Sequence, residues 1–348
     1  MSDKSLSSVK RFFRWVDLHH GVLGFIATVV TVIVTVGVAY KSIQTSADLF
    51  SEELKAQKDA AQVANVANYV SAISEALLVF KDSDEEALDR FVVSRSELLL
   101  ESLSTSTLLA QVIQFISDND FAKLFDTTRY FQEKKFLSLA GKDLSYIELN
   151  DITFTTTSLY CVNLTGSYLS RTTFNFPDFS YVNMENLNFN ETKLNGARVY
   201  WSNLKDVSIE LSGQEENLPL IFSQTSFIFS NLQGLRLGKS NSQSESLDPD
   251  KLKKQQQEDL EVLAKMLFNS KSLYGSLLDN DLKQSMIDID AEKYEKLVSL
   301  EYFLKVDSVP NASLEASRKT YSTEAQLIAQ QEGWRQRWQA KIERWCKK

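Results

Sequence analysis

The sequence is poor in the residues that build metal centres and disulfide frameworks. It contains two cysteines, two histidines, four prolines and eleven glycines among 348 residues. Cys161 and Cys346 lie far apart and form no CxxC pair, so we interpret them as two unpaired thiols, with neither a disulfide framework nor a zinc site. The only histidines, His19 and His20, are adjacent and give a metal at most a partial site. We therefore expect no metal and no cofactor.

Sequence motifs of catalysis are missing as well. The chain has no glycine-rich phosphate loop, no HExxH and no GxSxG, so we expect no enzyme, no catalytic residue and no small-molecule substrate. The chain has a net charge of -8 and a pI of about 5.1. It therefore lacks the excess of basic residues that is typical of a protein that binds nucleic acid through phosphate contacts. No nucleic-acid partner is expected. With 43% hydrophobic and 24% charged residues, the composition is that of a folded protein.

What the sequence does have is a long uncharged run, GVLGFIATVVTVIVTVGVAY, at residues 21–40. As a helix it would cross a hydrocarbon core of about 30 Å, and it is longer than the apolar core of a cleaved signal peptide. Four basic residues in the tail 1–20 precede it and two follow closely, namely Lys4, Lys10, Arg11, Arg14, Lys41 and Lys55. The positive-inside rule thus favours a single-pass protein in the lipid bilayer, with a cytoplasmic N-terminus.

The next segment, residues 41–136, has the spacing of amphipathic helices. Apolar residues step by three and four along its first part and form a seam of Val63, Val66, Val70, Ile73, Leu77 and Phe80. Two further stretches, 85–103 and 105–116, carry apolar residues at helical spacing, and the polar "SDND" at 117–120 ends the second. We expect a helical neck and cap that packs within the same chain, with self-association through the seam as the alternative.

Residues 137–238 repeat with a period of five, which fits neither the 3.6-residue period of a helix nor the two-residue period of a strand. Fourteen successive positions of this register carry a large apolar residue, namely Leu144, Leu149, Phe154, Leu159, Leu164, Leu169, Phe174, Phe179, Met184, Phe189, Leu194, Val199, Leu204 and Ile209. Such periodicity indicates a solenoid, in which each unit buries its apolar side by stacking on the next. Ser170 and Asn175 should point outward, and their replacement should have little effect on stability.

The segments VNLTG, VNMEN, TKLNG, ARVYW and SNLKD resemble pentapeptide repeats, whose family pattern is A(D/N)Lxx. The resemblance implies a right-handed quadrilateral β-helix, with four pentapeptides as the four sides of one coil. Pro177 occupies an inward small position and lacks an N–H, so we expect a local irregularity there. The order of anchor, helices and repeats also resembles membrane proteins of this family from cyanobacteria and other bacteria, for which the family offers no agreed activity.

After this region the five-residue period is interrupted twice. It breaks at "SGQEENLP", 212–219, and resumes at Phe222, Phe227, Leu232 and Leu237. Residues 239–250 are polar and rich in serine, which is typical of a linker. Residues 251–310 begin with a helix up to Leu267 and return to steps of five at Phe268, Leu273 and Leu278, so we expect a last coil completed across the inserted helix. The fold class is α+β, with an N-terminal transmembrane helix and helical region, the pentapeptide-repeat solenoid and a helical C-terminal region.

Residues 311–348 are predicted to form an amphipathic helix. Trp334, Trp338, Ile342 and Trp345 share one face, and basic residues are interleaved with them. The alternatives are a helix at the membrane surface with its cations on anionic lipid, a helix docked on the body of the same chain, and contact with a partner protein. The candidate contact residues are Trp334, Arg335, Arg337, Trp338, Lys341, Arg344 and Trp345.

Together these parts favour a membrane-anchored, non-catalytic scaffold or protein-interaction protein. The neck would space the solenoid from the bilayer, and polar repeat faces would meet an unidentified protein partner. The alternative is a DNA-mimicking inhibitor of a topoisomerase, gyrase, an activity that the family resemblance brings with it. Residues 141–211 hold eight acidic and five basic residues, and the predicted rod is short, so the alternative lacks the long acidic surface of a duplex.

Overall fold

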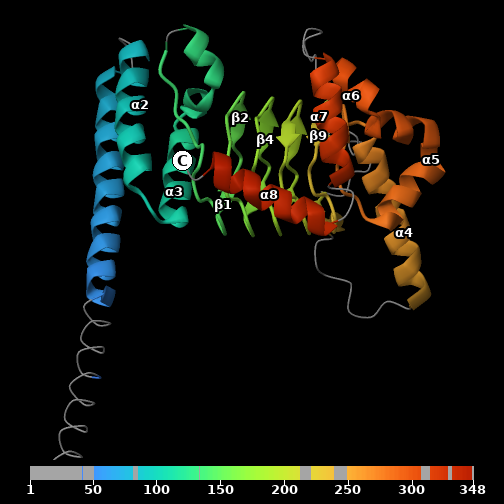
Figure 1. Cartoon of the computed structure of the whole chain (residues 1–348). Coiled ribbons are helices and arrows are strands. Elements are labelled where there is room, and N and C mark those ends of the chain that lie inside the picture. Colours follow the sequence, from blue (N-terminus) through green and yellow to red (C-terminus); the bar gives the residue numbers. More distant parts are fainter. Residues whose placement is uncertain are drawn as a thin grey trace, which may run out of the picture. The chain divides into compact units, whose positions relative to one another are not determined.

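The computed structural model describes residues 41, 51–80, 85–132, 134–211, 221–238, 249–306, 314–327 and 331–346 (Figure 1). The chain divides into two compact units, residues 1–64 and 65–348. The predicted tail 1–20 and transmembrane segment 21–40 lie outside the described residues. Within the described part, one helix, Ser51–Phe80, is long and apolar enough by length and composition to cross a membrane, a test that core helices of soluble proteins also pass.

The second unit begins with helices whose apolar faces meet. Residues 65–80 of that helix pack with α2 (Glu85–Ser102) and α3 (Ser106–Asp118), and two short 3-10 helices follow, η1 (Ala122–Phe125) and η2 (Thr127–Gln132). Ile73 of the predicted seam is fully buried, whereas Val63 is 55% exposed. Tyr69 joins the helices, because its hydroxyl is 2.7 Å from Ser96 Oγ and its ring packs edge-on against Phe115.

A β-solenoid follows, built of three-residue strands. These are β1 (Glu148–Asn150), β2 (Thr153–Thr155), β3 (Tyr168–Ser170), β4 (Thr173–Asn175), β5 (Asn188–Asn190), β6 (Lys193–Asn195), β7 (Arg198–Tyr200), β8 (Ser208–Glu210), β9 (Ser226–Ile228) and β10 (Arg236–Gly238). They form parallel sheets of order β1-β3-β5-β8-β10, β2-β4-β6 and β7-β9. Leu149 pairs with Leu169 and Leu169 with Phe189, so one coil takes twenty residues, or four pentapeptides.

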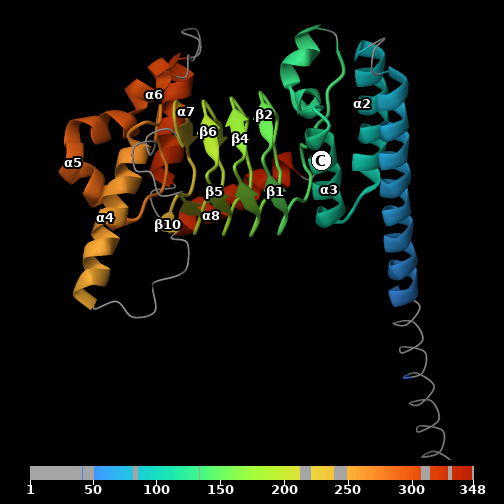
Figure 2. The ribbon, with the colours of Figure 1, turned by 180° about the vertical axis from the view of Figure 1, so that it is seen from behind.

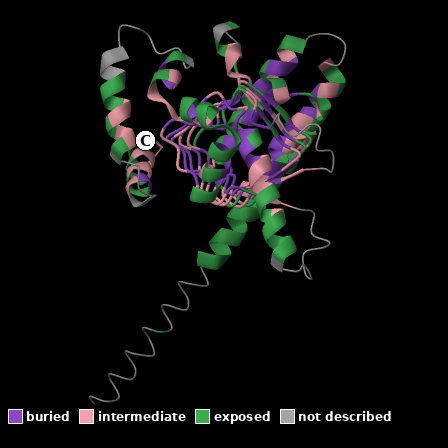
Figure 3. Ribbon diagram, turned by 90° about the vertical axis from the view of Figure 1, so that its right-hand side faces the viewer, coloured by how far each residue is buried: buried purple, intermediate pink, exposed green. Residues whose placement is uncertain are grey.

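The core lies inside the coils, as the buried residues in Figure 3 show. All fourteen large residues of the five-residue register are at most 2% exposed. Phe174 stacks on Phe154 of the preceding coil and meets Phe179 of its own coil edge-on, with ring centroids 5.1 and 5.2 Å apart. Strands of three residues suffice because one central residue per side points inward.

The chain turns each corner through left-handed backbone. From Tyr146 to Asp206, thirteen successive corner residues have positive φ, between 45° and 65°, and eleven of them are not glycine. Such residues normally avoid this region. Here the hydrogen bonds between coils hold the conformation, as at Cys161, whose N–H donates to the carbonyl of Ser180 at 3.0 Å. At Gly196 a Cβ would lie 2.4 Å from the ring of Phe176, one coil earlier.

The irregularity expected at Pro177 does not occur. The N–H of Asp178 donates to Thr157, and the carbonyl of Pro177 accepts from Arg198 at 2.9 Å, so the hydrogen bonds to both neighbouring coils are made. The inward position supplies a carbonyl to the ladder and the next residue supplies the N–H. Proline therefore fits, because the donor that it lacks is not part of the ladder.

The two interruptions of the period are insertions between paired strands. Ile209 pairs with Leu237, which is 28 residues further along the chain. This step is eight residues longer than one coil, and the break at 212–219 has the same length. The next coil resumes after α4 (Pro249–Leu267), where Ser226 pairs with Ser272 and Asn231 with Leu277. The last coil is thus completed across the inserted helix.

Both ends of the stack are covered. At the first coil, the side-chain amide of Gln114 in α3 donates to the carbonyl of Asn150 at 3.0 Å and accepts from its N–H at 3.1 Å. At the last coil, the N–H of Leu273 donates to Leu297 in α5 (Asn280–Val298), which α6 (Leu300–Val306) follows. These contacts satisfy strand edges that would otherwise pair with another chain.

The C-terminal segment differs from its prediction in two ways. It forms two helices, α7 (Leu314–Leu327) and α8 (Gln331–Trp345), where one was expected over 311–348. Cys161 and Cys346 form a disulfide, with their Cα atoms 5.5 Å apart, so the interpretation as two unpaired thiols is wrong. The reason is tertiary, because α8 crosses the coils and brings the end of the chain to the first of them (Figures 1 and 2).

Candidate functional site

The largest sheet of the solenoid presents ordered polar side chains. We name as the β1–β10 face the outward residues of β1, β3, β5, β8 and β10 (Figure 2), namely Glu148, Asn150, Tyr168, Ser170, Asn188, Asn190, Ser208, Glu210 and Arg236. Asn190 Nδ2 donates to the Tyr168 hydroxyl at 2.7 Å, and Asn188 Nδ2 donates to Glu210 Oε1 at 2.6 Å. These bonds between successive coils fix the side chains before any partner arrives.

Ser170 departs from the expectation of an exposed outward residue. It is 3% exposed, because the guanidinium of Arg171 and the amide of Asn190 lie 3.2 and 3.3 Å from its hydroxyl. Its replacement is therefore not equivalent to a surface change. Asn175, in contrast, is only partly buried, and it accepts a hydrogen bond from Asn195 at 3.0 Å.

A second polar row runs along another side of the coils, in the column Asp143, Asn163, Asn183, Asn203 and Asn231. The amide of Asn163 donates to Asp143 at 2.9 Å, that of Asn203 to Asn183 at 3.0 Å, and that of Asn231 to Asn203 at 3.2 Å. Asn203 and Asn231 are buried. We read this ladder as structural, since its groups already satisfy one another.

Helix α8 lies against one corner of the solenoid, along a set of residues that we name the corner column, Cys161, Tyr181, Trp201 and Phe229. The indole Nε1 of Trp334 donates to the carbonyl of Phe229 at 2.6 Å. Lys341 lies over the ring of Trp201, with Nζ 4.5 Å from its centroid. Helix α8 therefore runs along the column in the opposite direction to the coils. It contacts Phe229 first and Trp201 next, and the disulfide to Cys161 follows at the first coil.

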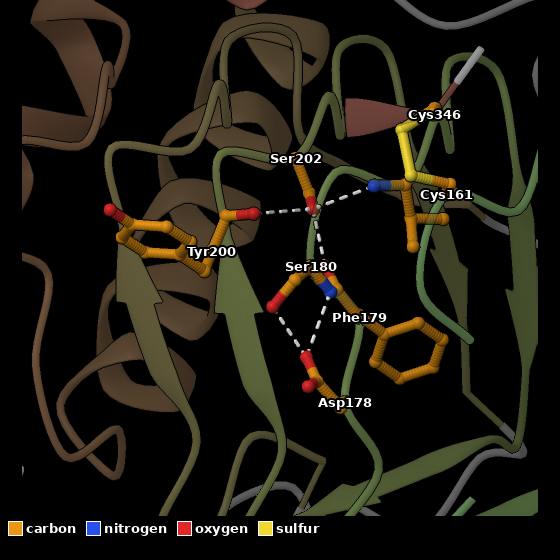
Figure 4. Close-up of a disulfide and its surroundings, with 8 residues drawn as sticks. Cys161, Asp178, Phe179, Ser180, Tyr200, Ser202 and Cys346 are labelled. Atoms are coloured by element: carbon orange, nitrogen blue, oxygen red, sulfur yellow. Dashed lines mark hydrogen bonds between the residues drawn. A yellow bond between two sulfur atoms is a disulfide. The ribbon is translucent and has the colours of Figure 1, made fainter. Parts of the chain in front are cut away.

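Figure 4 shows how the backbone beside the disulfide is fixed. Ser202 Oγ lies within hydrogen-bonding distance of the carbonyls of Phe179 and Tyr200 and accepts the N–H of Val182. The carboxylate of Asp178 accepts the N–H of Ser180 at 3.0 Å and its hydroxyl as well. Because the N–H of Cys161 donates to the carbonyl of Ser180 at 3.0 Å, this ordered backbone also holds the corner from which Cys161 projects.

Ion pairs join α7 to α8 beside this corner. Glu324 in α7 accepts Arg337 at 3.0 Å and lies 3.5 Å from Lys341 Nζ, both in α8. Desolvation by burial raises the pKa of Tyr181 to about 12, with smaller contributions from Tyr160, Asp178 and other neighbours. Burial likewise raises the pKa of Tyr200. These tyrosines are therefore neutral at neutral pH, and their rings pack edge-on, with centroids 5.8 Å apart.

The predicted contact residues of α8 occupy different environments. Trp334 is 2% exposed and stacks on the partly buried Trp338, so neither presents a free indole. Trp345 is 45% exposed, with the guanidinium of Arg344 over its ring. Arg335 and Arg344 are exposed, whereas Arg337 and Lys341 are partly buried. The exposed basic and aromatic groups thus lie mainly at the end of the helix.

Other chemistry-bearing groups form a structural cluster near the first coil. Asp89 of α2 is 7% exposed and lies 3.0 Å from the guanidinium of Arg129 and 3.4 Å from the ammonium of Lys123. These two ion pairs join α2 to the two 3-10 helices. In the described part of the chain, no group of three or more His, Cys, Asp or Glu side chains could hold a metal ion.

Sequence reasoning missed the disulfide, whereas docking of α8 on the body of its own chain was one of the alternatives that it left open. It also missed the aromatic contact between the solenoid and α7, where the ring centroids of Phe229 and Tyr321 are 5.8 Å apart. One signal was available: Cys161, Tyr181 and Trp201 occupy the same corner twenty residues apart. That spacing places Cys161 in line with the large aromatic residues.

No protein-family model matches the chain, and comparison with curated proteins finds no match. Solved structures with similarity include a pentapeptide repeat protein from the thylakoid lumen of Arabidopsis thaliana, 23% identical, with a TM-score of 0.23, over 33% of this chain and 70% of that one. QnrB1, a plasmid-mediated fluoroquinolone resistance protein, is 13% identical with a TM-score of 0.19, over 42% and 65%. HetL from the cyanobacterium Nostoc, a pentapeptide repeat protein involved in regulating heterocyst differentiation, is 18% identical with a TM-score of 0.18, over 28% and 57%.

The coils themselves define the type of repeat. Four pentapeptides make each twenty-residue coil, one large residue of every pentapeptide points inward, and the corner follows two residues later. By its own geometry this region is a β-solenoid of five-residue repeats.

Proposed function

We propose that this pentapeptide-repeat protein is a membrane-anchored, non-catalytic scaffold whose β1–β10 face binds a protein partner. The observation that carries the proposal is the order of that face, where Asn190 bonds Tyr168 and Asn188 bonds Glu210 across coils. A surface ordered in advance loses little conformational freedom when a partner binds. The exposed ends of this face, Glu148 and Arg236, have opposite charges and suit a protein surface of mixed charge.

The anchor is proposed from residues 21–40, which are uncharged and long enough to span a bilayer. Membrane fractionation with alkaline extraction tests it, and protease protection at both termini tests the proposed cytoplasmic N-terminus. Recovery of the full chain in the soluble fraction after extraction would contradict the anchor. It would leave the binding proposal untouched.

The binding proposal is tested by affinity capture of the full-length chain from detergent-solubilised membranes, followed by mass spectrometry. Tyr168→Ala combined with Asn188→Ala should abolish recovery of the partner. Thr153→Ala combined with Thr155→Ala is the matched control, because both threonines are exposed on the β2-β4-β6 sheet. Repeated capture of the chain alone, or equal capture by both double variants, would refute the β1–β10 face as the binding surface.

The DNA-mimicry alternative receives less support. The repeat region mixes basic groups with its acids, as where Arg171 pairs with Asp151 at 2.6 Å and Lys205 with Asp206 at 3.1 Å. A duplex presents regularly spaced negative charge instead. A gyrase supercoiling assay with the full-length chain tests this alternative, and inhibition at low concentration would place it ahead of the scaffold.

A further inference from the structure

The disulfide joins two parts of the molecule that are otherwise held differently. The N–H of Cys161 donates to the carbonyl of Ser180 at 3.0 Å, in the next coil, whose backbone is fixed by the bonds of Ser202 and Asp178 (Figure 4). Cys346 directly follows the last turn of α8, and its N–H donates to the carbonyl of Ile342 at 2.9 Å. Both cysteines are only partly buried. A thiol from solution can therefore approach the bond while the coils remain folded.

The two halves of α8 differ in their contacts with the solenoid. The first half is anchored by Trp334, which is 2% exposed and hydrogen-bonded to Phe229, a fully buried residue. In the last turn, Trp345 is 45% exposed and its ring contacts Arg344 of the same helix. Lys341 lies between the halves, held by Glu324 and the ring of Trp201. Beyond Lys341, the covalent bond between Cys346 and Cys161 fixes the helix end to the coils.

We propose that the Cys161–Cys346 disulfide is a redox-controlled latch, and that its reduction by a dithiol releases the end of α8 from the corner column while the rest of the protein stays folded. The thiolate of the reductant attacks one sulfur and forms a mixed disulfide, and its second thiol resolves it. The protein disulfide gains two electrons and two protons and becomes two thiols, and the dithiol is oxidised to its own disulfide. The balance requires no further reactant.

Release changes the surface of the molecule at one place. The end of α8 carries Arg344 and Trp345, and Lys347 and Lys348 follow in the sequence. In the oxidised protein the disulfide holds the turn with Arg344 and Trp345 at the first coil. In the reduced protein this turn of α8 is free to leave the corner column. The latch thereby couples the exposure of this corner to thiol redox state, independently of the scaffold proposal.

The test uses the full-length chain in detergent, oxidised or treated with dithiothreitol without denaturant. Alkylation with N-ethylmaleimide and mass spectrometry counts the reduced cysteines, and hydrogen–deuterium exchange reports each segment. We expect reduction under native conditions, and exchange at residues 341–346 at least about ten-fold faster than in the oxidised protein. At short labelling times, when exchange reports local opening and not global unfolding, residues 331–338 and the strands should stay unchanged.

Two matched variants sharpen the test. Cys346→Ser should show the fast exchange at 341–346 without reductant and no further response to it, whereas Trp345→Phe should keep the response of the natural sequence. Resistance to dithiothreitol in the absence of denaturant would overturn the latch. So would equal exchange at 341–346 in both redox states, or a loss of protection throughout the coils, which would make the disulfide a structural staple.

Discussion

The coils of the solenoid and helix α8 are stabilised by contacts of different range. Each coil bonds the next one, twenty residues further along, and the same pairing recurs from Leu149 to Leu169 and from Leu169 to Phe189. Helix α8 depends on a few distant contacts, such as Trp334 with Phe229, 105 residues apart, and Cys346 with Cys161, 185 residues apart. Coil stability is therefore a sum over neighbours, whereas the position of α8 depends on a few single residues.

The largest effect is expected inside the coils. Phe174→Ala removes a ring that is 2% exposed and packs on Phe154 and Phe179, so the free energy of unfolding should fall by about 3–5 kcal/mol. Asn175→Ala, the adjacent residue, should lower it by about 0.5–1 kcal/mol through the lost bond to Asn195. Chemical unfolding followed by circular dichroism measures both. Equal losses would contradict the inward register.

Removal of the disulfide should have the next largest effect. Cys161→Ser opens a loop of 185 residues and should lower the free energy of unfolding by about 2–4 kcal/mol, because the unfolded chain gains freedom. The same denaturation curves measure the loss. Cys346→Ser should match it, and the double variant should lose no more than either one. Additive losses would mean that the serines disturb each site separately rather than through the shared bond.

A smaller loss is expected at one corner of the coils. Gly196→Ala places a methyl group 2.4 Å from the ring of Phe176 at φ +64° and should lower the free energy of unfolding by about 2 kcal/mol. Gly141→Ala is the matched control, since its φ is +72° and no atom lies within 4 Å of the added Cβ. It should lose only the backbone part, about 1 kcal/mol. Thermal unfolding of both variants isolates the contribution of the ring.

In helix α8, Trp334→Phe removes the hydrogen bond to the carbonyl of Phe229 and retains an aromatic ring. We expect a loss of about 1 kcal/mol in the free energy of unfolding. Trp345→Phe should change it by less than about 0.5 kcal/mol, because this residue is 45% exposed. Denaturant titration of the two variants distinguishes them. A larger loss for Trp345→Phe would mean that the helix end is anchored by its indole.

A further effect is expected at alkaline pH. Burial raises the pKa of Tyr181 from its ordinary value of 10.0 to about 12, so the folded state retains this proton more strongly than the unfolded state. The resulting stability is fully present below pH 10 and is lost as the pH rises towards 12. The difference between the absorbance titrations of the natural sequence and Tyr181→Phe should show a step near pH 12. A step near pH 10 would place the phenol in water.

Much of the solenoid could be predicted because its contacts repeat. The spacing of five identified the large inward residues from Leu144 to Ile209. The break at 212–219 marked the position of the insertion. Ser170 was misjudged, because its cover comes from Arg171 and Asn190, which the register alone does not arrange around it. The sequence shows no comparable period for the helices α5 and α6 or for the division of the C-terminal segment into α7 and α8.

By itself the sequence determined the coil, since an inward residue every fifth position, with small residues before it, has one arrangement that buries them all. It also determined where the period stops and where it resumes. Only the tertiary structure decided that α8 lies on the corner column, that Trp334 is buried, and that Cys161 and Cys346 meet. The physical reason is distance along the chain: pairing between coils recurs every twenty residues and leaves a periodic pattern, whereas a single contact across 185 residues leaves none.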